Sequence, residues 1–498
     1  MSDEKPQEPT VPVNQVIEGR IEKLNKLREM GINPYPYTYN VTHNTKQLLD
    51  GYDELAEKET PIQTAGRIMA IRKMGKAAFL HFMDEWGRLQ CYMKKNVIGD
   101  ELWEQFLLLD MGDFIGMKGT MFTTRTGEQT VKIEEFEILT KSLHPLPEKW
   151  HGLTDKETRY RQRYVDLIVN QEVRDVFKTR SKVLQAIRNF LNDRGFMEVE
   201  TPVLQPLYGG GIAVPFVTHH RKLDMDLYLR IADELYLKRL IVGGYDKVWE
   251  MCKDFRNEGL DRKHNPEFTM IELYQAFADY HDMMDLYEDL LRHTIKEVSG
   301  NSFLEYEGEK IEFGEPFKRI SMIDAVKENG GPDLSDFDFD KALKLAKDAN
   351  FDKAKMLNHG KIVEAFFDEL VEPTLQQPTF IIDHPKDISP LAKVHRDNPN
   401  LAERYELFAC GMELGNAFSE LNDPLDQKQR FIDQGKVAEA GDEEAHQLDH
   451  DFINALMYGM PPTGGLGIGV DRIVMLCTNQ HSIQDVLFFP QMRSQKEE

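Results

Sequence analysis

The pattern of apolar and polar residues predicts a strand-rich region near the start of the chain. Residues 62–139 form short strand-like runs with turn signals at 84–87 and 126–128, and one helical stretch at 101–110 interrupts them. Four or five strands with a single inserted helix are typical of a small Greek-key barrel of the oligonucleotide-binding (OB) type. A barrel with a purely structural role remains the alternative.

The N-terminal region combines a polar tail with one helical pattern. Residues 1–13 are rich in proline and charge, and we expect them to be disordered. Apolar residues then recur at helical spacing from Val16 to Met30, with basic residues between them, and Gly31 is a plausible helix stop. The basic face could touch RNA, although an ordinary solvated face is the simpler interpretation.

Helical and strand patterns alternate after a proline-containing linker at 144–147. An amphipathic helix around 183–191 ends at Gly195, and residues 196–204 predict a strand that ends at Pro202. The later part predicts helices within 226–245, 280–298 and 424–458, strands at 379–383 and 405–423, and a helix-bearing insertion at about 300–378.

The rest of the chain is organised around the segment Val248–Tyr274. Two strand-like runs flank a charged turn at 257–266, which glycine and proline punctuate. The period of two along the second strand places four side chains on one face: Phe268, Met270, Glu272 and Tyr274. An aromatic ring beside polar groups and an arginine could hold a planar ring and an anion. Taken alone, the segment could equally be a solvated hairpin.

Composition narrows the class of protein. The chain has 498 residues, which suggests about three domains. Its net charge of −24 argues against a general nucleic-acid coat protein but not against an enzyme that acts on nucleic acid, because local patches matter more than the sum. Four distant cysteines without a CxxC pair argue against a disulfide framework or a zinc ribbon. With no signal-type apolar region and no run as long as a membrane span, we expect a soluble, cytoplasmic protein.

The glycine-rich stretch 464–469 precedes a predicted helix that starts near Asp471. It is not a Walker loop, because no Gly-Lys-Ser/Thr follows, and Arg472 occupies the place of the third glycine of a dinucleotide fingerprint. An arginine in the first turn of a helix is disfavoured by the helix dipole unless an anion is bound there. The pattern therefore indicates either a phosphate contact or a glycine turn with an exposed arginine.

The segment 405–421 could carry a metal site. If Cys410 and Gly411 form a two-residue turn, Glu406 and Glu413 lie diagonally on one face of a hairpin. Two such carboxylates suit Mg²⁺ that bridges nucleotide phosphates. Strict alternation would place Asn416, Phe418 and Glu420 on the opposite face, unless a bulge at Gly415 turns them back. A solvated acidic hairpin is the alternative.

Three segments in order resemble the motifs of class II aminoacyl-tRNA synthetases. FMEVETPVL resembles the first motif, which in that family builds the dimer interface, VWEMCKDFRNEG followed by KHNPEFTMIELY resembles the second, and GLGIGVDRIVML the third. ELGNAFSELND lies between the second and the third. From about residue 15, the chain resembles a bacterial-type class II lysyl-tRNA synthetase.

The resemblance implies an α+β protein with an OB-fold barrel followed by an antiparallel catalytic sheet flanked by helices. The implied regions are a tail and helix at 1–58, an anticodon-binding barrel at 59–144, a linker at 145–178, and a catalytic domain at 179–493 with the insertion at about 300–378. It also implies ATP and L-lysine as substrates, tRNA(Lys) as the acceptor, a homodimer, and about three Mg²⁺ ions per active site.

Matching the motifs residue by residue gives roles in the active site. Arg256 and Arg472 are the catalytic candidates, with Arg256 on the ATP α-phosphate and the substrate carboxylate and Arg472 on the outer phosphates. Glu406 and Glu413 resemble the Mg²⁺ ligands. The other implied ATP contacts are Glu258, His264, Asn265 and Phe268. The implied lysine contacts are Gly210 and Glu234 for the α-amino group, Asn416 for the carboxylate, Phe418, and Glu272, Tyr274 and Glu420 around the side-chain ammonium.

A physical argument independently supports the roles of Glu272, Tyr274 and Glu420. A site that takes a lysine side chain out of water needs carboxylate and hydroxyl partners, and these three residues supply them. In the barrel, the residues that would read a uridine-rich anticodon are Arg72, Phe79, Gln90 and Glu135.

The sequence departs from the family pattern at two places. Lys263 stands where an arginine usually precedes His-Asn, so a bidentate phosphate contact becomes a point charge. The loop PLYGGGIAVPF also differs from the common basic or alanine-rich version, and we expect an altered contact there to ATP or the tRNA end.

Other functions fit the sequence less well than this resemblance. A lysine ligase that modifies an elongation factor shares the catalytic core but lacks the barrel. Aspartyl and asparaginyl synthetases share the architecture, but Glu272 and Glu420 favour a substrate with an ammonium group. A non-catalytic RNA-binding scaffold would have lost its phosphate and metal residues, whereas Arg256 and the paired glutamates are present.

Overall fold

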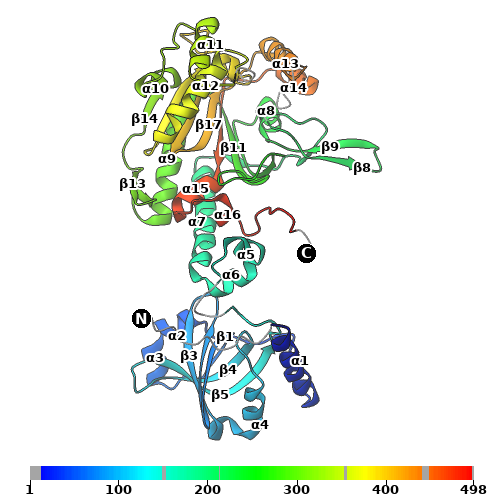
Figure 1. Cartoon of the computed structure of the whole chain (residues 1–498), viewed down its shortest axis with the longest axis vertical. Coiled ribbons are helices and arrows are strands. Elements are labelled where there is room, and N and C mark those ends of the chain that lie inside the picture. The colour runs from blue at the N-terminus through cyan, green and yellow to red at the C-terminus, as the bar shows by residue number, and fades with distance from the viewer. Residues whose placement is uncertain (1–12, 148–152, 212, 353–355, 440–447, 496–498) are drawn as a thin grey trace, which may run out of the picture. The chain divides into compact units, whose positions relative to one another are not determined.

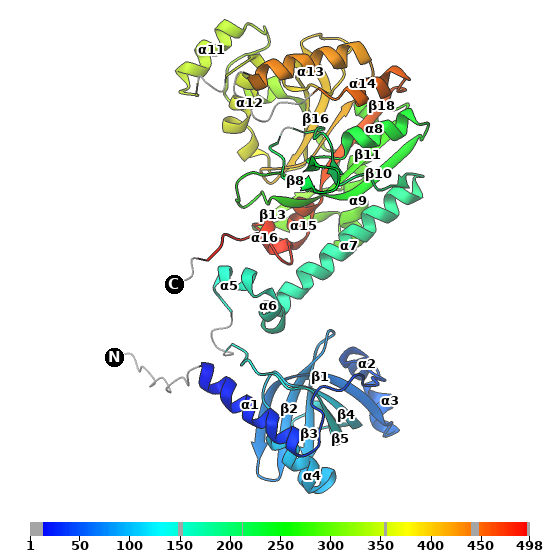
Figure 2. The same cartoon turned by 90° about the vertical axis from the view of Figure 1, so that its right-hand side faces the viewer.

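The structure, a computed structural model, describes residues 13–147, 153–211, 213–352, 356–439 and 448–495, without the side chains of 436–439. The expectation of disorder for 1–13 falls outside these residues except at Val13. The chain divides into two compact units, Met1–Thr154 and Asp155–Glu498, which are shown in Figures 1 and 2. No helix in the described part is both long and apolar enough to cross a membrane.

The first unit is a closed five-stranded barrel with strand order β1-β2-β3-β5-β4, which confirms the predicted barrel. Alternate residues point inward along each strand, so that Ile68, Leu80, Cys91 and Ile133 are fully buried in its core. Its strands are β1 (Ile62–Met74), β2 (Ala77–Met83), β3 (Arg88–Lys94), β4 (Phe114–Thr123) and β5 (Gln129–Thr140). Its helices are α1 (Val13–Glu29), α2 (Thr45–Asp50), α3 (Tyr52–Glu57) and α4 (Lys95–Leu107).

The second unit is built on an eight-stranded sheet with the order β14-β15-β16-β17-β18-β11-β10-β6. Its pairs are antiparallel except β14 with β15 and β10 with β6. The strands are β6 (Met197–Glu198), β10 (Lys247–Phe255), β11 (Glu267–Ala276), β14 (Lys318–Ser321), β15 (Thr379–Pro385), β16 (Leu401–Ala409), β17 (Met412–Ser419) and β18 (Thr463–Gly469). Two small sheets accompany it: β7 (Leu204–Gln205) with β8 (Val217–His220) and β9 (Met225–Leu229), and β12 (Phe303–Tyr306) with β13 (Glu309–Glu312).

Helices cover one face of the large sheet and frame the other (Figure 2). Apolar side chains of α7 (Gln171–Asp193), α9 (Tyr280–Ser299) and α15 (Val470–Thr478) pack on Ile271 and Leu273 of β11. Glu272, which lies between these two, therefore faces away from the helices. The remaining helices are α5 (Lys156–Arg161), α6 (Arg163–Val169), α8 (Glu234–Val242), α10 (Met322–Glu328), α11 (Phe339–Asp348), α12 (His359–Leu370), α13 (Pro424–Glu439), α14 (His450–Met457) and α16 (Ile483–Val486), with 3₁₀ turns η2 (Glu372–Thr374) and η3 (Lys386–Ile388).

Two strand predictions need correction. The strand predicted over 196–204 is only two residues long, because beyond Val199 the backbone bonds to a side chain in place of a neighbouring strand: Thr201 N donates to Glu250 Oε2 at 2.9 Å. The interpretation of 464–469 as a glycine turn is wrong. These residues form β18, a central strand between β17 and β11.

Candidate active site

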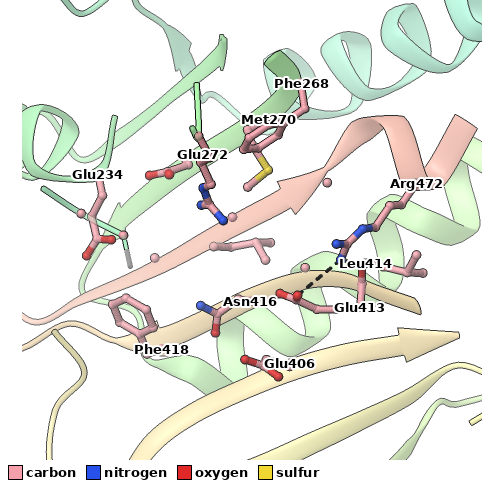
Figure 3. Close-up of a pocket in the computed structure, with 18 of the residues that line it drawn as sticks. Glu234, Phe268, Met270, Glu272, Glu406, Glu413, Leu414, Asn416, Phe418 and Arg472 are labelled. Carbon is pink, nitrogen blue, oxygen red and sulfur yellow. Dashed lines mark hydrogen bonds and ion pairs between the residues drawn. The ribbon is translucent and has the colours of Figure 1, made fainter. Parts of the chain in front are cut away.

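A cavity of about 530 Å³ opens on the face of the sheet opposite α7 and α9, and Arg472 in the first turn of α15 lines it. It brings together every residue of the second unit that the sequence suggested for a site. Strand β18 forms its floor between walls from β11 and from β16 and β17, and Figure 3 shows side chains of β11, β16 and β17 pointing into it. The roles of the individual residues stay predictions, but their convergence in one cavity is a property of the fold.

Strand β11 supplies one wall. Its alternation is as predicted: Phe268, Met270, Glu272 and Tyr274 all line the cavity, while Ile271 and Leu273 are covered by helices. The Tyr274 hydroxyl donates to Glu272 Oε2 at 2.9 Å. The hypothesis of a solvated hairpin is therefore wrong for this strand.

The hairpin of β16 and β17 supplies the opposite wall. Ala409 pairs with Met412, so Cys410 and Gly411 form the two-residue turn, and both have positive φ angles. The register then shifts: Phe408 pairs with Glu413 and Leu407 with Gly415, which leaves Leu414 as the extra residue of a bulge.

This bulge decides which face the next residues occupy. Glu406 pairs directly with Asn416 and Arg404 with Phe418, and all four line the cavity. Glu413 also lines it, three positions before Asn416, which regular alternation would not allow. The possible bulge near Gly415 is therefore confirmed, at Leu414, and it brings the acid pair and the Asn416–Glu420 segment to one face.

The glycines of β18 leave space at the floor of the cavity, because they carry no side chains. A Cβ placed on Gly465 would lie 1.9 Å from Glu420 Oε1 and 2.6 Å from Tyr274 Cε1. By contrast, a Cβ on Gly469 would approach no atom closer than 3.6 Å. Gly465 thus makes room for two side chains that would otherwise be displaced, so the strand tolerates a residue that weakens strands elsewhere.

Glu406 and Glu413 form an acid pair at one part of this surface. Glu406 Oε1 accepts from Arg404 Nη2 at 2.6 Å, and Glu413 Oε2 lies 3.3 Å from Arg472 Nη1 (Figure 3). Burial raises the pKa of Glu406 to about 7; Arg404 opposes the rise, and the negative charge of Glu413 adds to it. Two carboxylates that repel each other at a cavity wall offer the oxygen ligands that Mg²⁺ prefers, so these residues fit a divalent cation.

The loop between β10 and β11 closes one side of the cavity. Arg256 Cζ lies 5.2 Å from the centroid of the Phe268 ring, and the buried Nε of Arg256 has no hydrogen-bond partner among the described residues. His264 contacts Asp261 through Nδ1 at 2.7 Å and Arg472 Nη2 through Nε2 at 3.3 Å. A buried guanidinium nitrogen without an acceptor is a suitable contact for an anion.

Other residues of this loop are placed less simply. Glu258 is exposed and lines the cavity. Asn265 is buried, where its side chain donates to Glu267 O at 2.6 Å and accepts from Gln491 N at 3.3 Å, so much of its hydrogen-bonding capacity is used within the protein. Gly210 belongs to a different loop, between β7 and β8; it has a φ of +83° and lies beside Glu234 in the same cavity.

The other end of the cavity is acidic. Glu234, Glu272 and Glu420 line it together with the ring of Phe418. Burial raises the pKa of Glu420 to about 8 against the opposing charge of Lys238. Burial also raises the pKa of Glu272 well above its usual value, and the charges of Asp233 and Glu234 add to that rise. Three ionised carboxylates repel one another when no cation is bound beside them, and a bound cation would stabilise their charged forms.

Two charged residues of this region were missed from the sequence. Lys238 is fully buried behind the acidic end and donates to Glu234, four residues earlier on α8. The sequence could have revealed this contact, because a Glu and a Lys four residues apart on a helix lie side by side. Arg404 donates to Glu406 Oε1 and, through Nε, to Asn416 Oδ1 at 3.0 Å. Its position two residues before Glu406 on one strand would have placed it on the same face.

The predicted anticodon residues lie on the outer surface of the barrel in the first unit. Arg72 pairs with Phe79 across β1 and β2, and Phe79 packs on Tyr92 with 4.8 Å between ring centroids. Gln90 donates to Glu128 Oε2 at 2.5 Å. Glu135 lies farther along β5, where it forms an ion pair with Lys118 at 2.9 Å. The surface therefore offers an aromatic platform flanked by polar groups, which suits single-stranded bases.

Comparison with known proteins agrees with this architecture. Residues 155–493 match the family described as tRNA synthetases class II (D, K and N), and residues 62–139 match the OB-fold nucleic acid binding domain. The chain belongs to the class II tRNA synthetases of this group.

Relatives with assigned names indicate which member of this group the chain resembles. A protein of Carboxydothermus hydrogenoformans named lysine–tRNA ligase is 54% identical over 482 residues, covering 97% of this chain and 98% of that protein. Proteins with the same name from Pelotomaculum thermopropionicum and Clostridium tetani are 53% and 51% identical, over 97% and 96% of this chain and 95% and 96% of those proteins.

Proposed function

We propose that this protein is a lysine–tRNA ligase, which activates L-lysine with ATP and transfers it to the 3′ end of tRNA(Lys). One observation carries the proposal: a single cavity brings basic groups together with a cluster of three buried carboxylates, those of Glu234, Glu272 and Glu420. Arg256, Arg472 and His264 suit the phosphates of ATP, and the acidic end suits a substrate with a side-chain ammonium. An acidic amino acid would be repelled there.

In the first step, a carboxylate oxygen of lysine attacks the α-phosphorus of ATP. The bond from that phosphorus to the oxygen bridging to the β-phosphate breaks, so lysyl-adenylate forms and pyrophosphate leaves. Arg256 holds the α-phosphate and the attacking carboxylate together, and Phe268 stacks on the adenine. Arg472, which already contacts His264 and Glu413, turns its remaining donors to the outer phosphates.

Glu406 and Glu413 would hold Mg²⁺, which when bound neutralises phosphate charge. Glu258 and Asn265 lie near the adenine. At the other end, Glu234 and the Gly210 carbonyl bind the α-amino group. Asn416 binds the carboxylate, and Glu272, Tyr274 and Glu420 surround the ammonium beside Phe418. This end excludes water from the ammonium, so a neutral side chain of the same length would leave buried acids unpaired.

In the second step, a hydroxyl of the terminal ribose of tRNA attacks the lysyl carbonyl and AMP leaves. The barrel supports tRNA as the acceptor, because its outer surface combines the Phe79 platform with Arg72, Gln90 and Glu135, which would read the anticodon. We assign 59–144 to this anticodon-binding region, 179–493 to catalysis, and about 300–378 to an insertion. Within that insertion, β14 joins the edge of the catalytic sheet.

We also propose a homodimer. Apolar side chains around β6 to β9 are exposed in the single chain, among them Met197, Leu204, Val217 and Leu223, the last two at 60% and 65%. The β8–β9 hairpin projects from its unit (Figure 1). Exposed apolar groups on one side of a domain are typical of an interface.

Four free cysteines support a reducing, cytoplasmic setting.

The proposal is tested by exchange of labelled pyrophosphate into ATP with each of the twenty amino acids. We expect exchange with lysine, and its loss in Arg256→Ala. Arg319→Ala removes an exposed ion pair with Asp285 at the sheet edge and serves as the control, with exchange close to that of the unchanged protein. Exchange driven by aspartate, or by none of the amino acids, would contradict the proposal.

A further inference from the structure

Lys238 is a buried cation next to the acidic end of the cavity. It is 0% exposed, its Nζ donates to Glu234 Oε1 at 2.5 Å, and it also contacts the Glu420 carboxylate. Three aromatic rings surround the ammonium, those of Phe418, Tyr274 and Phe452, with centroids at 5.3, 5.9 and 6.0 Å. The protein thus holds one of its own lysines in the kind of environment that a lysine substrate requires.

This lysine does not line the cavity. Glu234 and Glu420 do, and Lys238 lies behind them on α8. Burying an ammonium costs several kcal/mol unless close partners compensate, and here two carboxylates and three ring faces do so. Because α8 sets the spacing between Glu234 and Lys238, the amine can hold both carboxylates at a defined separation.

The charges at this end form a simple balance. Three carboxylates line it, those of Glu234, Glu272 and Glu420, and Lys238 offsets one of them. Two negative charges remain when all three acids are ionised. A lysine zwitterion brings two ammonium groups, while its carboxylate is assigned to Arg256 and Asn416. Without Lys238 the end would carry one negative charge more than lysine can neutralise.

We propose that Lys238 is a positioning residue that sets the charge of the lysine site, by favouring the ionised forms of Glu234 and Glu420 and by orienting these carboxylates toward the substrate. The inference rests on the proposed lysine specificity. Among the described residues, the other titratable or charged groups that act on this site are Glu272 and Tyr274 of β11, Arg404 of β16, and Asp233 and Asp254 beyond Glu272. Burial lowers the pKa of Lys238, but the charges of Glu234 and Glu420 outweigh burial and hold its pKa above the usual value.

The test compares Lys238→Met, which keeps length and apolar volume, with Lys238→Arg, which keeps the charge. Lys253→Met, which removes a weak exposed pair with Glu267, is the control. Lysine binding without ATP is measured by titration calorimetry from pH 6.5 to 9 in buffers of different ionisation heat. This experiment reports both affinity and the number of protons released.

For Lys238→Met, we expect affinity at pH 7 to fall by about tenfold or more and to recover with rising pH, because one additional proton must leave the acids before lysine binds. Proton release should rise by about one, while Lys238→Arg and the control stay near the unchanged protein. A loss that is equal at all pH values, with unchanged proton release, would overturn the inference and indicate a structural role. If the unchanged protein does not bind lysine, the proposed function fails instead.

Folding supplies a second readout. If Lys238→Met is insoluble or melts early, the double variant with Glu234→Gln removes one charge of each sign and should restore the melting temperature when charge balance is the cause. Equal instability of the single and double variants would contradict a charge-setting role.

Discussion

Lys263 in the loop between β10 and β11 donates to Glu372 Oε1 of η2 at 3.0 Å and to the Gly411 carbonyl, in the turn between β16 and β17, at 2.6 Å. The lysine that replaces an expected arginine is therefore engaged within the protein. It ties the loop that carries Arg256 and His264 to the opposite wall of the cavity. Its side chain is 41% exposed, so the ion pair contributes on the order of 0.5 kcal/mol.

From this geometry, Lys263→Met should loosen the loop without removing a phosphate contact. We expect the KM for ATP to rise about two- to fivefold, as a contact of about 0.5–1 kcal/mol implies, with kcat and the KM for lysine nearly unchanged. Pyrophosphate exchange kinetics measure all three constants. A hundredfold loss in kcat would show instead that Lys263 contacts the phosphates directly.

Gly465 gives a second prediction, because its missing side chain makes room for Glu420 and Tyr274. Gly465→Ala should reduce lysine-dependent exchange by about a hundredfold or more, since the 1.9 Å contact displaces the carboxylate from the ammonium site. Gly469→Ala lies on the same strand with no contact below 3.6 Å and should stay within about threefold of the unchanged protein. Similar losses in both variants would mean that the strand, rather than the site, is sensitive.

Lysine affinity should depend on pH through Glu420. Its pKa in the empty cavity is raised to about 8, and lysine binds the ionised form, so protonation competes with the substrate below that pH. The Kd for lysine should therefore fall by up to about tenfold per pH unit between pH 6.5 and 8 and then level off. Calorimetry without ATP measures this, and Glu420→Gln should bind weakly with a flatter profile. An affinity independent of pH over this range would contradict the assignment.

The barrel can be tested separately from the catalytic unit. Phe79→Leu keeps an apolar side chain beside Tyr92 but removes the ring that would stack on a base. We expect aminoacylation of tRNA to fall about tenfold or more, as the loss of one base stack implies, with pyrophosphate exchange unchanged. Leu107→Ala, at an exposed position on α4, is the control. Equal losses in aminoacylation and exchange would point to a structural role for the barrel.

Local patterns predicted much of the fold and of the site. Alternation placed Phe268, Met270, Glu272 and Tyr274 on the cavity wall, and the two-residue turn at Cys410 and Gly411 brought Glu406 and Glu413 to one face. These predictions succeeded because strand period and turn length depend on residues that are neighbours in sequence. The barrel strands could be predicted for the same reason.

Other features depended on strand pairing that the local pattern does not specify. No local rule distinguishes the bulge at Leu414 from regular alternation, since it is the pairing with β16 that shifts the register and turns Asn416 and Glu420 to the cavity. Glycine-rich β18 contradicts strand propensity and is stable because β11 and β17 pair with it on both sides.

The amino-acid sequence alone determined the residue types of the site, the order of its motifs and the faces of its regular strands. The tertiary structure decided which of those faces meet, that Lys263 is engaged with Glu372, and that Lys238 lies behind Glu234 and Glu420. The physical reason is that hydrogen-bonded local geometry repeats with a short period, whereas burial and charge pairing act between residues that only the folded chain brings within a few ångströms of one another.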